Sequence, residues 1–547
     1  MEAISNLAAT LLALDRRDEA LQHWLRAVKL RPSFFEAVEH LIGLLCSSQR
    51  GKEAVNIIEF VQNSIRSPKN GDCFASDEHA SEPESDAESR ASSASDLGSY
   101  EASFDYDDDF GRSVATNRGS ADVGSAGFGS SGYAIPGCDN GRMLALVHAK
   151  GNMLYALGDN AAAAVAFEDA ILIAAGRRRH GIQSLIKQIF SAFMQGTHHG
   201  YPGPEQREQQ ETILLYPDHA LQTAKLVFAP CGTPPGIKYV PEGLARKAAI
   251  STTSNSLLSL AKIYQDGMSN ISSSGVPRSA PGVRDILALY YLSLSLQPSP
   301  STANNVGILL AGIQNNAPKK VLPRPSGEMQ HPEIPGVIPG TGISLALAYY
   351  NYGLHLDSRH AHLYTNLGSL LKDIGQLQAA IRMYEQAVHC DSNFDIALAN
   401  LANAVKDAGR VNDAIVYYKR AVKVNPEFAE AVCGLANALN SVCNWVGRGG
   451  VGNGYGFRDR WHVDEQGMIR DAYTIETGTG WIKRVVEIVD RQLKEGEAWG
   501  RGLLTPNVIE QLCAQLAPAA SSRGHVTFGT LAKILQAWAG QRWEGSR

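Results

Sequence analysis

The most regular hydrophobic pattern in the chain lies between residues 361 and 445, where apolar residues recur at i, i+3, i+4 and i+7. This spacing places the apolar side chains on one face of a helix, so the segment predicts a series of amphipathic helices that each bury one stripe. Similar side chains also recur at a longer, constant separation along the chain. The pairs of positions are Leu367 and Leu401, Leu371 and Val405, Gly375 and Gly409, Ala380 and Ala414, Tyr384 and Tyr418, and Ala387 and Ala421. A third unit keeps this phase through Leu435, Ala436 and Leu439.

The step within each pair, about 34 residues, resembles the period of the tetratricopeptide repeat, which is a pair of antiparallel helices. Gly or Ala at the eighth, twentieth and twenty-seventh positions lets two helix backbones approach closely, and larger residues at the fourth, seventh, eleventh and twenty-fourth positions fill the space between them. One helix pair cannot bury its apolar face alone, so such repeats stack on their neighbours. The predicted fold class is therefore all-α, a tetratricopeptide-repeat α-solenoid (superhelix) that is interrupted by disordered inserts.

The same template finds repeats elsewhere in the chain. It predicts two N-terminal units in residues 1–66, one unit in residues 141–175, and an array in residues 251–445. Two inserts rich in Pro, Gly or Ser interrupt this array near residues 268–283 and 315–341. Both are predicted to be loops, because a helix does not continue through so many Pro and Gly residues.

Four segments fall outside the repeats. Residues 67–140 are acidic and rich in Ser and Gly, and they are predicted to be disordered because they cannot bury enough apolar surface. Residues 176–250 predict an irregular helical region, residues 446–480 a Gly-rich insert, and residues 481–547 C-terminal helices. The first of these helices is predicted to be packed through one apolar stripe: Ile482, Val485, Val486, Val489 and Leu493.

The Gly-rich insert contains a match to the dinucleotide-binding spacing G-x-G-x-x-G at Gly447, Gly449 and Gly452. That fingerprint requires a strand before it, a helix immediately after it and an acidic residue about twenty positions later. Here the preceding segment is predicted to be the first helix of the last repeat, and residues 455–467 show no helical period. The glycines are therefore interpreted as an insert in a helical hairpin and not as a nucleotide site.

Charge and composition narrow the possible partners. The 547 residues include 50 basic and 55 acidic side chains, and a formal net charge of −5 argues against nucleic acid as the main partner. No apolar run approaches the roughly 18 residues that span a bilayer, so no membrane association is expected. The N-terminus has no basic leader, and the eight cysteines lack paired spacing, which is typical of thiols in a reducing compartment.

Candidate binding residues occupy the sixth position of the repeat, on the first helix, which is expected to face the concave side of the solenoid. This position is asparagine in four units: Asn6, Asn305, Asn366 and Asn400. A carboxamide both donates and accepts hydrogen bonds, so a row of them could hold the backbone of an extended peptide whatever its sequence. The alternative is that these asparagines bond only within the array.

Two segments near the end of the repeats carry a more specific resemblance. The run "FAEAVCGLANALNSVCNW", followed at a distance by "IKRVVEIVDRQLKEG", resembles the last repeats of the fungal protein O-linked N-acetylglucosaminyltransferase (O-GlcNAc transferase) family, and "TTSNSLLSLAKIYQDGMSN" is also similar. The resemblance covers most of residues 141–500. It implies a superhelix whose asparagine ladder feeds protein substrates to a C-terminal catalytic region, which transfers GlcNAc from UDP-GlcNAc to Ser or Thr. It also implies a location in the nucleus and cytoplasm.

The chain departs from this family after the helix at 482–493. Two parallel-sheet lobes need several hundred residues, whereas only about fifty follow, and they show no alternation of strands and helices. No catalytic, cofactor-binding or metal-binding residue can therefore be assigned. No cofactor is expected in this chain, and UDP-GlcNAc would be the donor substrate only if the missing catalytic region exists. The chain alone is expected to bind substrates without glycosylating them.

Three interpretations remain open. The chain is the repeat-containing, substrate-binding portion of an O-GlcNAc transferase, or it is a freestanding scaffold or adaptor without enzymatic activity. A self-contained enzyme has the least support, because the sequence contains no P-loop, no metal cluster and no G-x-S-x-G motif. In the first two cases the expected partners are protein clients or extended peptides, and a homodimer through the repeats is possible.

Overall fold

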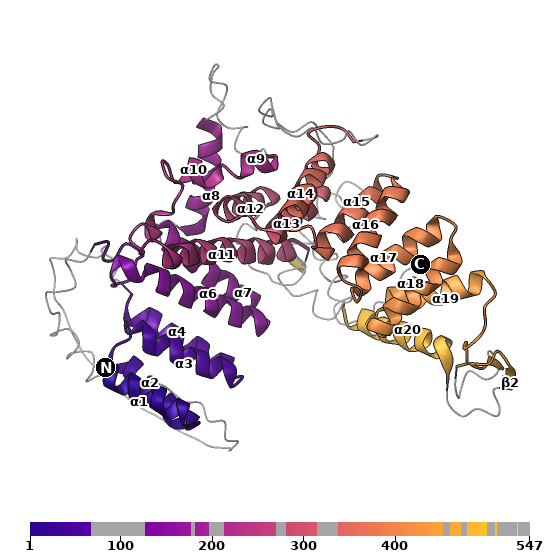
Figure 1. The fold of residues 1–547 in the computed structure, drawn as a ribbon, viewed down its shortest axis with the longest axis horizontal. Coiled ribbons are helices and arrows are strands. Elements are labelled where there is room, and N and C mark those ends of the chain that lie inside the picture. Colours follow the sequence, from indigo (N-terminus) through magenta and orange to yellow (C-terminus); the bar gives the residue numbers. More distant parts are fainter. Residues whose placement is uncertain are drawn as a thin grey trace. The chain divides into compact units, whose positions relative to one another are not determined.

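Most of the described residues are helical (Figure 1). The computed structural model describes residues 1–66, 126–176, 181–195, 213–269, 281–313, 337–451, 460–471 and 478–499, together with Ile509, Glu510 and Lys533. The chain divides into two compact units. Unit 1 contains Met1–Leu185 and Thr233–Thr253, and unit 2 contains Ile186–Gly232 and Ser254–Arg547.

Unit 1 is a stack of helical hairpins. Its repeats are formed by α1 (Glu2–Ala13), α2 (Arg17–Leu30), α3 (Phe35–Ser47), α4 (Gly51–Ser64), α6 (Asn140–Ala156) and α7 (Asn160–Ala175). Each of these helices packs against the next one in this order, so the hairpin of α6 and α7 continues the stack begun by α1–α4. The short helices η1 (Gly137–Asp139) and η4 (Pro235–Ile237) pack against this last hairpin. Two further helices, α8 (Gly181–Gln195) and α11 (Leu244–Ser269), begin in unit 1 and end in unit 2.

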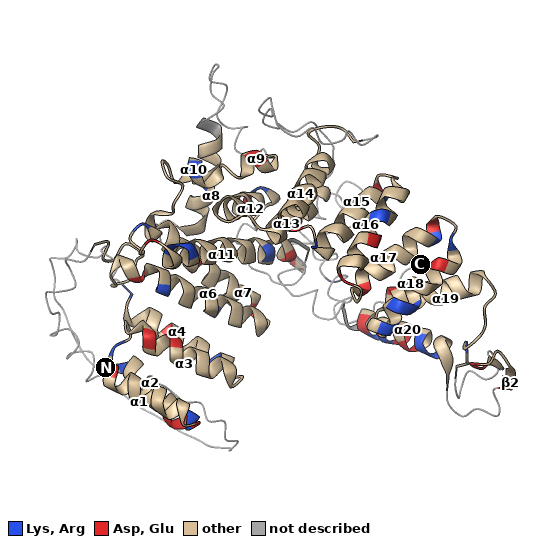
Figure 2. Ribbon diagram, in the orientation of Figure 1, with Lys and Arg blue, Asp and Glu red and all other residues tan. Residues whose placement is uncertain are grey.

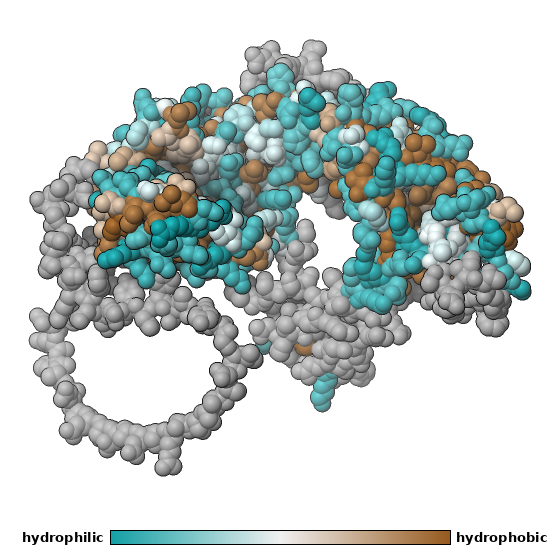
Figure 3. All heavy atoms as spheres, turned by 60° about the horizontal axis from the view of Figure 1, so that its bottom comes forward, coloured by the Kyte–Doolittle hydropathy of each residue, from teal (hydrophilic) through white to brown (hydrophobic). Residues whose placement is uncertain are grey.

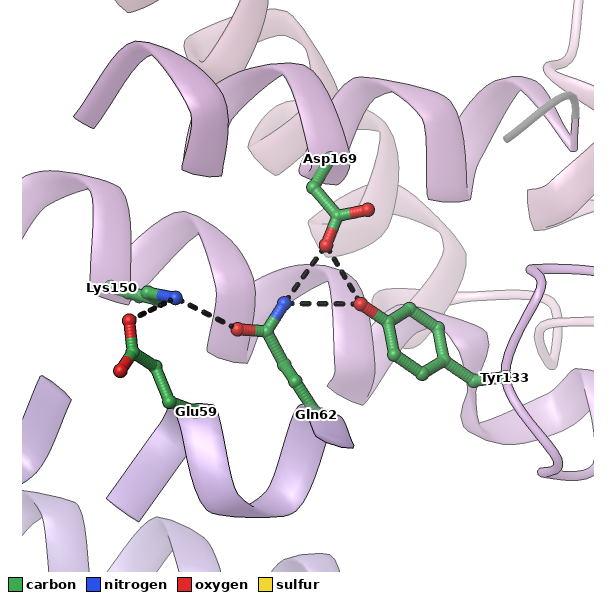
Figure 4. A network of polar contacts seen from close by, with 5 residues as sticks. All are labelled: Glu59, Gln62, Tyr133, Lys150 and Asp169. Atoms are coloured by element: carbon green, nitrogen blue, oxygen red, sulfur yellow. Dashed lines mark hydrogen bonds and ion pairs between the residues drawn. The ribbon is translucent and has the colours of Figure 1, made fainter. Parts of the chain in front are cut away.

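A network of polar side chains joins α4, α6 and α7 to the segment that precedes α6 (Figure 4). The Gln62 amide nitrogen donates to the Tyr133 hydroxyl at 3.0 Å and to Asp169 Oδ2 at 2.8 Å, and the Tyr133 hydroxyl donates to the same carboxylate oxygen at 2.7 Å. Lys150 Nζ donates to Gln62 Oε1 at 3.1 Å and pairs with Glu59 Oε1 at 2.9 Å. Buried polar groups are costly unless they are paired, so this network fixes α4 to the next hairpin.

Residues 126–139 belong to the fold of unit 1, although their composition assigned them to the disordered linker. Tyr133 and Ile135 are fully buried, and the Ala134 amide donates to the Ile65 carbonyl at 2.7 Å. The surrounding Gly/Ser-rich composition predicted disorder, although these two apolar residues pack in the core. The remainder of the predicted linker, residues 67–125, lies outside the described residues, as do residues 270–280 and 315–336 of the predicted inserts.

Unit 2 contains the longer repeat array. Its elements are α9 (Pro217–Ala220), α10 (Thr223–Val227), α12 (Val283–Leu296), α13 (Pro300–Ala311), α14 (Gly342–Leu356), α15 (Ala361–Asp373), α16 (Leu377–Cys390), α17 (Asp395–Asp407), α18 (Val411–Val424), α19 (Ala429–Ser441), β1 (Trp461–Val463), β2 (Ile469–Asp471) and α20 (Gly480–Trp499). α13 pairs with α14, α15 with α16 and α17 with α18 as helical hairpins. Each second helix also packs against the first helix of the next hairpin, which is how one repeat covers the apolar face of another.

The predicted Gly-rich insert contains a small antiparallel hairpin. Strands β1 and β2 pair with Trp461 opposite Asp471 and Val463 opposite Ile469. α20 begins after this hairpin and packs against α19. Basic and acidic residues are interspersed along α20 (Figure 2), where ion pairs join Lys483 to Glu487 and Asp490 to Lys494.

Candidate peptide-binding face

The first helices of the unit 2 repeats lie side by side. α13 contacts α15, α15 contacts α17, and α17 contacts α19, so these four helices form one layer, called here the first-helix layer. Three of the predicted ladder residues, Asn305, Asn366 and Asn400, lie on three consecutive helices of this layer. Asn6 lies on α1 in unit 1 and is exposed. The structure therefore groups three of the four ladder positions and leaves the fourth in the other unit.

Two of these three asparagines bond within the array. The Asn366 amide nitrogen donates to Asn304 Oδ1 at 2.7 Å, which links α15 to α13. The Asn305 side chain hydrogen-bonds the Tyr290 hydroxyl on α12, and burial raises the pKa of that hydroxyl. Asn400 is half-buried on α17. A carboxamide has two donor hydrogens and two acceptor lone pairs, so Asn366 keeps capacity for a ligand and the ladder remains a prediction.

The row of asparagines stops at Gly434 for a steric reason. Gly434 occupies the sixth position on α19, one repeat after Asn400. A Cβ atom at Gly434 would lie 2.5 Å from Cε1 of Tyr418, which is closer than real Cβ contacts. The fully buried Tyr418 ring therefore excludes any side chain from the sixth position of this repeat.

A second polar row, which was not among the predicted binding residues, lies at the ninth position of the repeat. The Asn403 amide nitrogen donates to Glu430 Oε1 at 2.7 Å, and Asn403 Oδ1 accepts a hydrogen bond from the Tyr418 hydroxyl. One repeat earlier, Ser369 Oγ lies 3.0 Å from the Tyr384 hydroxyl. The signal in the sequence is that Ser369, Asn403 and Asn437 are polar and follow one another at the repeat period.

Charges along the first-helix layer are mixed. Lys372 Nζ on α15 pairs with Asp407 Oδ2 on α17 at 2.8 Å. Burial, followed by the nearby charges of Asp407 and Glu430, raises the pKa of Tyr418 to about 12, so this hydroxyl stays protonated at neutral pH. The layer therefore offers neutral donors and acceptors beside paired charges, which suits an uncharged peptide backbone more than a highly charged ligand.

The backbone amides of several described glycines in the insert donate hydrogen bonds within the protein. The Gly447 amide donates to the Asp464 carbonyl at 2.9 Å, the Gly449 amide to the Val463 carbonyl at 2.7 Å, and the Gly450 amide to the Thr479 carbonyl at 3.1 Å. A phosphate site needs such amides to be available. Gly449 adopts a φ of 64° and touches the Thr479 backbone, so it serves a close approach of two backbone segments. Gly452 lies outside the described residues.

Apolar side chains are also exposed, and they gather in patches among hydrophilic ones in Figure 3. Large exposed apolar residues include Leu7 and Leu14 near α1, Ile469 on β2, and Val489 and Leu493 on α20. None of the described helices is both long and apolar enough to span a bilayer. Among the described residues, no three His, Cys, Asp or Glu side chains are placed to hold a metal ion.

Several solved structures are similar to parts of this chain. A structure from the functional characterization of Pseudomonas aeruginosa pilF is 13% identical, with a TM-score of 0.26 over 35% of this chain and 70% of that chain. MamA is 16% identical, with a TM-score of 0.24 over 43% and 94%. YrrB, described as a TPR protein with an unusual peptide-binding site, is 13% identical, with a TM-score of 0.24 over 35% and 78%.

Family models give more definite matches. None of the curated proteins compared with the chain matches it. Models of the tetratricopeptide repeat match residues 1–31, 361–392 and 399–441, which correspond to the hairpin α1–α2, to α15–α16, and to α17–α18 with α19. The chain therefore contains tetratricopeptide repeats in an all-α solenoid fold, and its repeat region is suited to protein–protein interaction.

Proposed function

We propose that the first-helix layer of unit 2 binds extended segments of protein partners. The observation that carries this proposal is the placement of carboxamides on three adjacent helices, with Asn366 and Asn400 at corresponding positions one repeat apart. Extended peptides present one donor and one acceptor per residue, and carboxamides at a fixed spacing can pair with them independently of side-chain sequence. The proposal requires no cofactor.

A double variant tests this proposal. We expect Asn366→Ala combined with Asn400→Ala to weaken binding of a peptide selected on the wild-type chain from a library of random unstructured peptides. Each lost hydrogen bond contributes about 0.5–1.5 kcal/mol, so the dissociation constant should rise roughly five- to a hundredfold. Fluorescence anisotropy measures the change.

The matched control is Asn412→Ala, which makes the same change at an exposed position on the second helix α18. It should leave the affinity unchanged. Equal affinity of the double variant and the wild type would show that these two asparagines serve only the array.

We further propose that this binding layer is the substrate-binding portion of a protein O-GlcNAc transferase-like protein that acts in the nucleus and cytoplasm. The supporting observation is the resemblance of residues 428–445 and 482–496 to the last repeats of that family. In this proposal the layer presents client Ser and Thr residues to a catalytic region that uses UDP-GlcNAc. Two copies pair through their repeats, which light scattering on the purified chain tests.

A freestanding adaptor is the second candidate, and it is favoured by the family models, which match the repeats alone. The coding sequence that follows the codon for Arg547 separates the two candidates. Sheet-forming segments and histidines of a glycosyltransferase in that reading frame would support the transferase proposal. An unrelated sequence would favour the adaptor.

A further inference from the structure

A segment of the chain itself lies across two second helices of unit 2 in the manner of a bound peptide. Residues 213–216 lead into α9, which packs against both α12 and α14, and α10 packs against α12 (Figure 1). Leu214 and Leu215 of this segment are 2% and 0% exposed. Two adjacent leucines are therefore buried on the surface formed by α12 and α14, called here the α12–α14 surface.

The backbone of this segment is held by two tyrosines. The Leu215 amide donates to the Tyr291 hydroxyl of α12 at 3.3 Å, and the Tyr349 hydroxyl of α14 donates to the Leu215 carbonyl at 3.0 Å. The two rings are stacked, with centroids 6.4 Å apart. One residue thus has both of its backbone groups bonded by side chains from two successive repeats. Backbone hydrogen bonds together with buried side chains are how protein surfaces recognise extended peptides.

The residues that follow this segment, in α9 and α10, also contact α12. The Ala224 amide donates to Ser295 Oγ of α12 at 3.0 Å. Ala220 and Ala224 are buried, and so are Val227 and Phe228. The segment therefore covers the outward side of α12 with apolar side chains along its length.

α12 is buried on its outer side as well as on the side that faces the repeats. Every residue from Ile286 to Leu294 is buried, whereas α16, the second helix of a later repeat, buries only one stripe. On α14, the run from Leu345 to Tyr350 is likewise buried. These second helices thus carry an apolar outer face that the corresponding helix of a later repeat does not have, and removing the segment would expose it to water.

We propose that the α12–α14 surface is a second peptide-binding surface, and that residues 213–217 are its resident and exchangeable ligand. A partner protein that carries two adjacent leucines followed by an aromatic residue and a proline in an extended segment would displace it. This surface is formed by second helices, so it is separate from the asparagine ladder. Attachment to the chain gives the resident segment a high effective concentration, which keeps weaker competitors out.

The test displaces the resident segment from the α12–α14 surface by introducing Leu214→Asp and Leu215→Asp into the full chain, which gives the emptied variant. The probe is a fluorescein-labelled synthetic peptide with the sequence of residues 211–219, ETILLYPDH. We expect saturable binding to this variant and at least tenfold weaker binding to the wild type, whose resident segment competes. Adding Tyr291→Phe and Tyr349→Phe to the emptied variant should weaken the peptide about tenfold, because two hydrogen bonds are lost.

The control variant is Leu226→Asp, which changes a leucine of α10 that is 48% exposed. It should bind the peptide no better than the wild type. If the emptied variant does not fold alone, refolding it with the peptide should restore a cooperative melting transition. Absence of that rescue, absence of saturable binding to a folded emptied variant, or equal binding to the wild type would overturn the proposal.

Discussion

Small residues at helix crossings accommodate buried aromatic rings in both units. A Cβ atom at Gly151 would lie 2.6 Å from Cε1 of Phe167, and one at Gly368 would lie 2.8 Å from Cδ1 of Tyr384. Both rings are almost completely buried, so they cannot move aside without disturbing the hairpin. The eighth position of the repeat is therefore small because the twenty-fourth is large.

Substituting Gly151 tests this packing rule. We expect Gly151→Ala to lower the free energy of unfolding by about 1–3 kcal/mol, because the added methyl overpacks the contact with Phe167. Gly43→Ala is the control, since it lies in helix α3 and a Cβ atom there would meet no other atom within 4 Å. Alanine favours a helix interior, so this control should be neutral or stabilise by up to about 1 kcal/mol. Urea unfolding of both variants measures the difference, and equal effects would refute the rule.

At the scale of single elements, the start of α15 depends on a neutral histidine. His360 is the N-cap of this helix, and its Nδ1 accepts a hydrogen bond from the Leu363 amide at 3.3 Å. Only an unprotonated nitrogen can accept this bond. Burial, and then the neighbouring His362, lower the pKa of His360 below its usual value of 6.5, against the opposing effect of Asp357.

This cap predicts a pH dependence of stability. Around and below the usual histidine pKa the unfolded chain binds more protons at this residue than the folded chain does, so stability rises with pH there and is lost as the pH falls. His148 adds to the same trend, because burial also lowers its pKa. We expect the free energy of unfolding to fall between about pH 7 and pH 5, and His360→Asn, which keeps a capping acceptor, to reduce this slope. Identical slopes for the variant and the wild type would contradict the role of His360.

α20 shows where an apolar pattern predicts a helix but not its buried face. The stripe that ends in Val489 and Leu493 predicted a packed helix, and the helix is present. Ile488 is 2% exposed, however, whereas Val489 is 41% and Leu493 is 64% exposed. The direction in which a helix packs depends on its neighbours, here α19, and helical periodicity does not contain that information.

At the scale of the whole molecule, the polar network in unit 1 implies that residues 67–125 can be cut without separating their flanks. We expect the N-terminal fragment to remain bound after cleavage at a protease site inserted in this segment, because α4 and α3 pack against α6 and Gln62 bonds Tyr133 and Asp169. Gel filtration should show one complex. Immediate separation of the fragments would contradict the prediction.

Two variants test whether the polar network contributes to the association of these fragments. Gln62→Leu removes the hydrogen bonds that the Gln62 amide makes to Tyr133, Asp169 and Lys150, so it should weaken the association of the fragments by about 1–3 kcal/mol. Gln22→Leu makes the same change on α2, away from this network, and should have no effect. Equal behaviour of the two variants would show that the network does not hold the cut chain together.

The candidate site was predictable in part. The repeat pattern placed Asn305, Asn366 and Asn400 at corresponding positions, and the structure brings them onto adjacent helices. Periodicity could not show that Asn366 bonds Asn304, or that Tyr418 closes the row at Gly434. Those facts depend on side chains from neighbouring repeats, which meet only after the helices have packed.

The sequence by itself determined the helical repeats, because a helix that buries one stripe must repeat its apolar residues with helical spacing, and a stack of equal hairpins must repeat the whole pattern once per hairpin. Only the tertiary structure decided how non-repeating segments join the array. The Tyr133 hydroxyl hydrogen-bonds Gln62 and Asp169, and the backbone of Leu215 hydrogen-bonds Tyr291 and Tyr349. These contacts join residues far apart in the chain through single hydrogen bonds and buried side chains, and such pairings leave no periodic trace in the sequence.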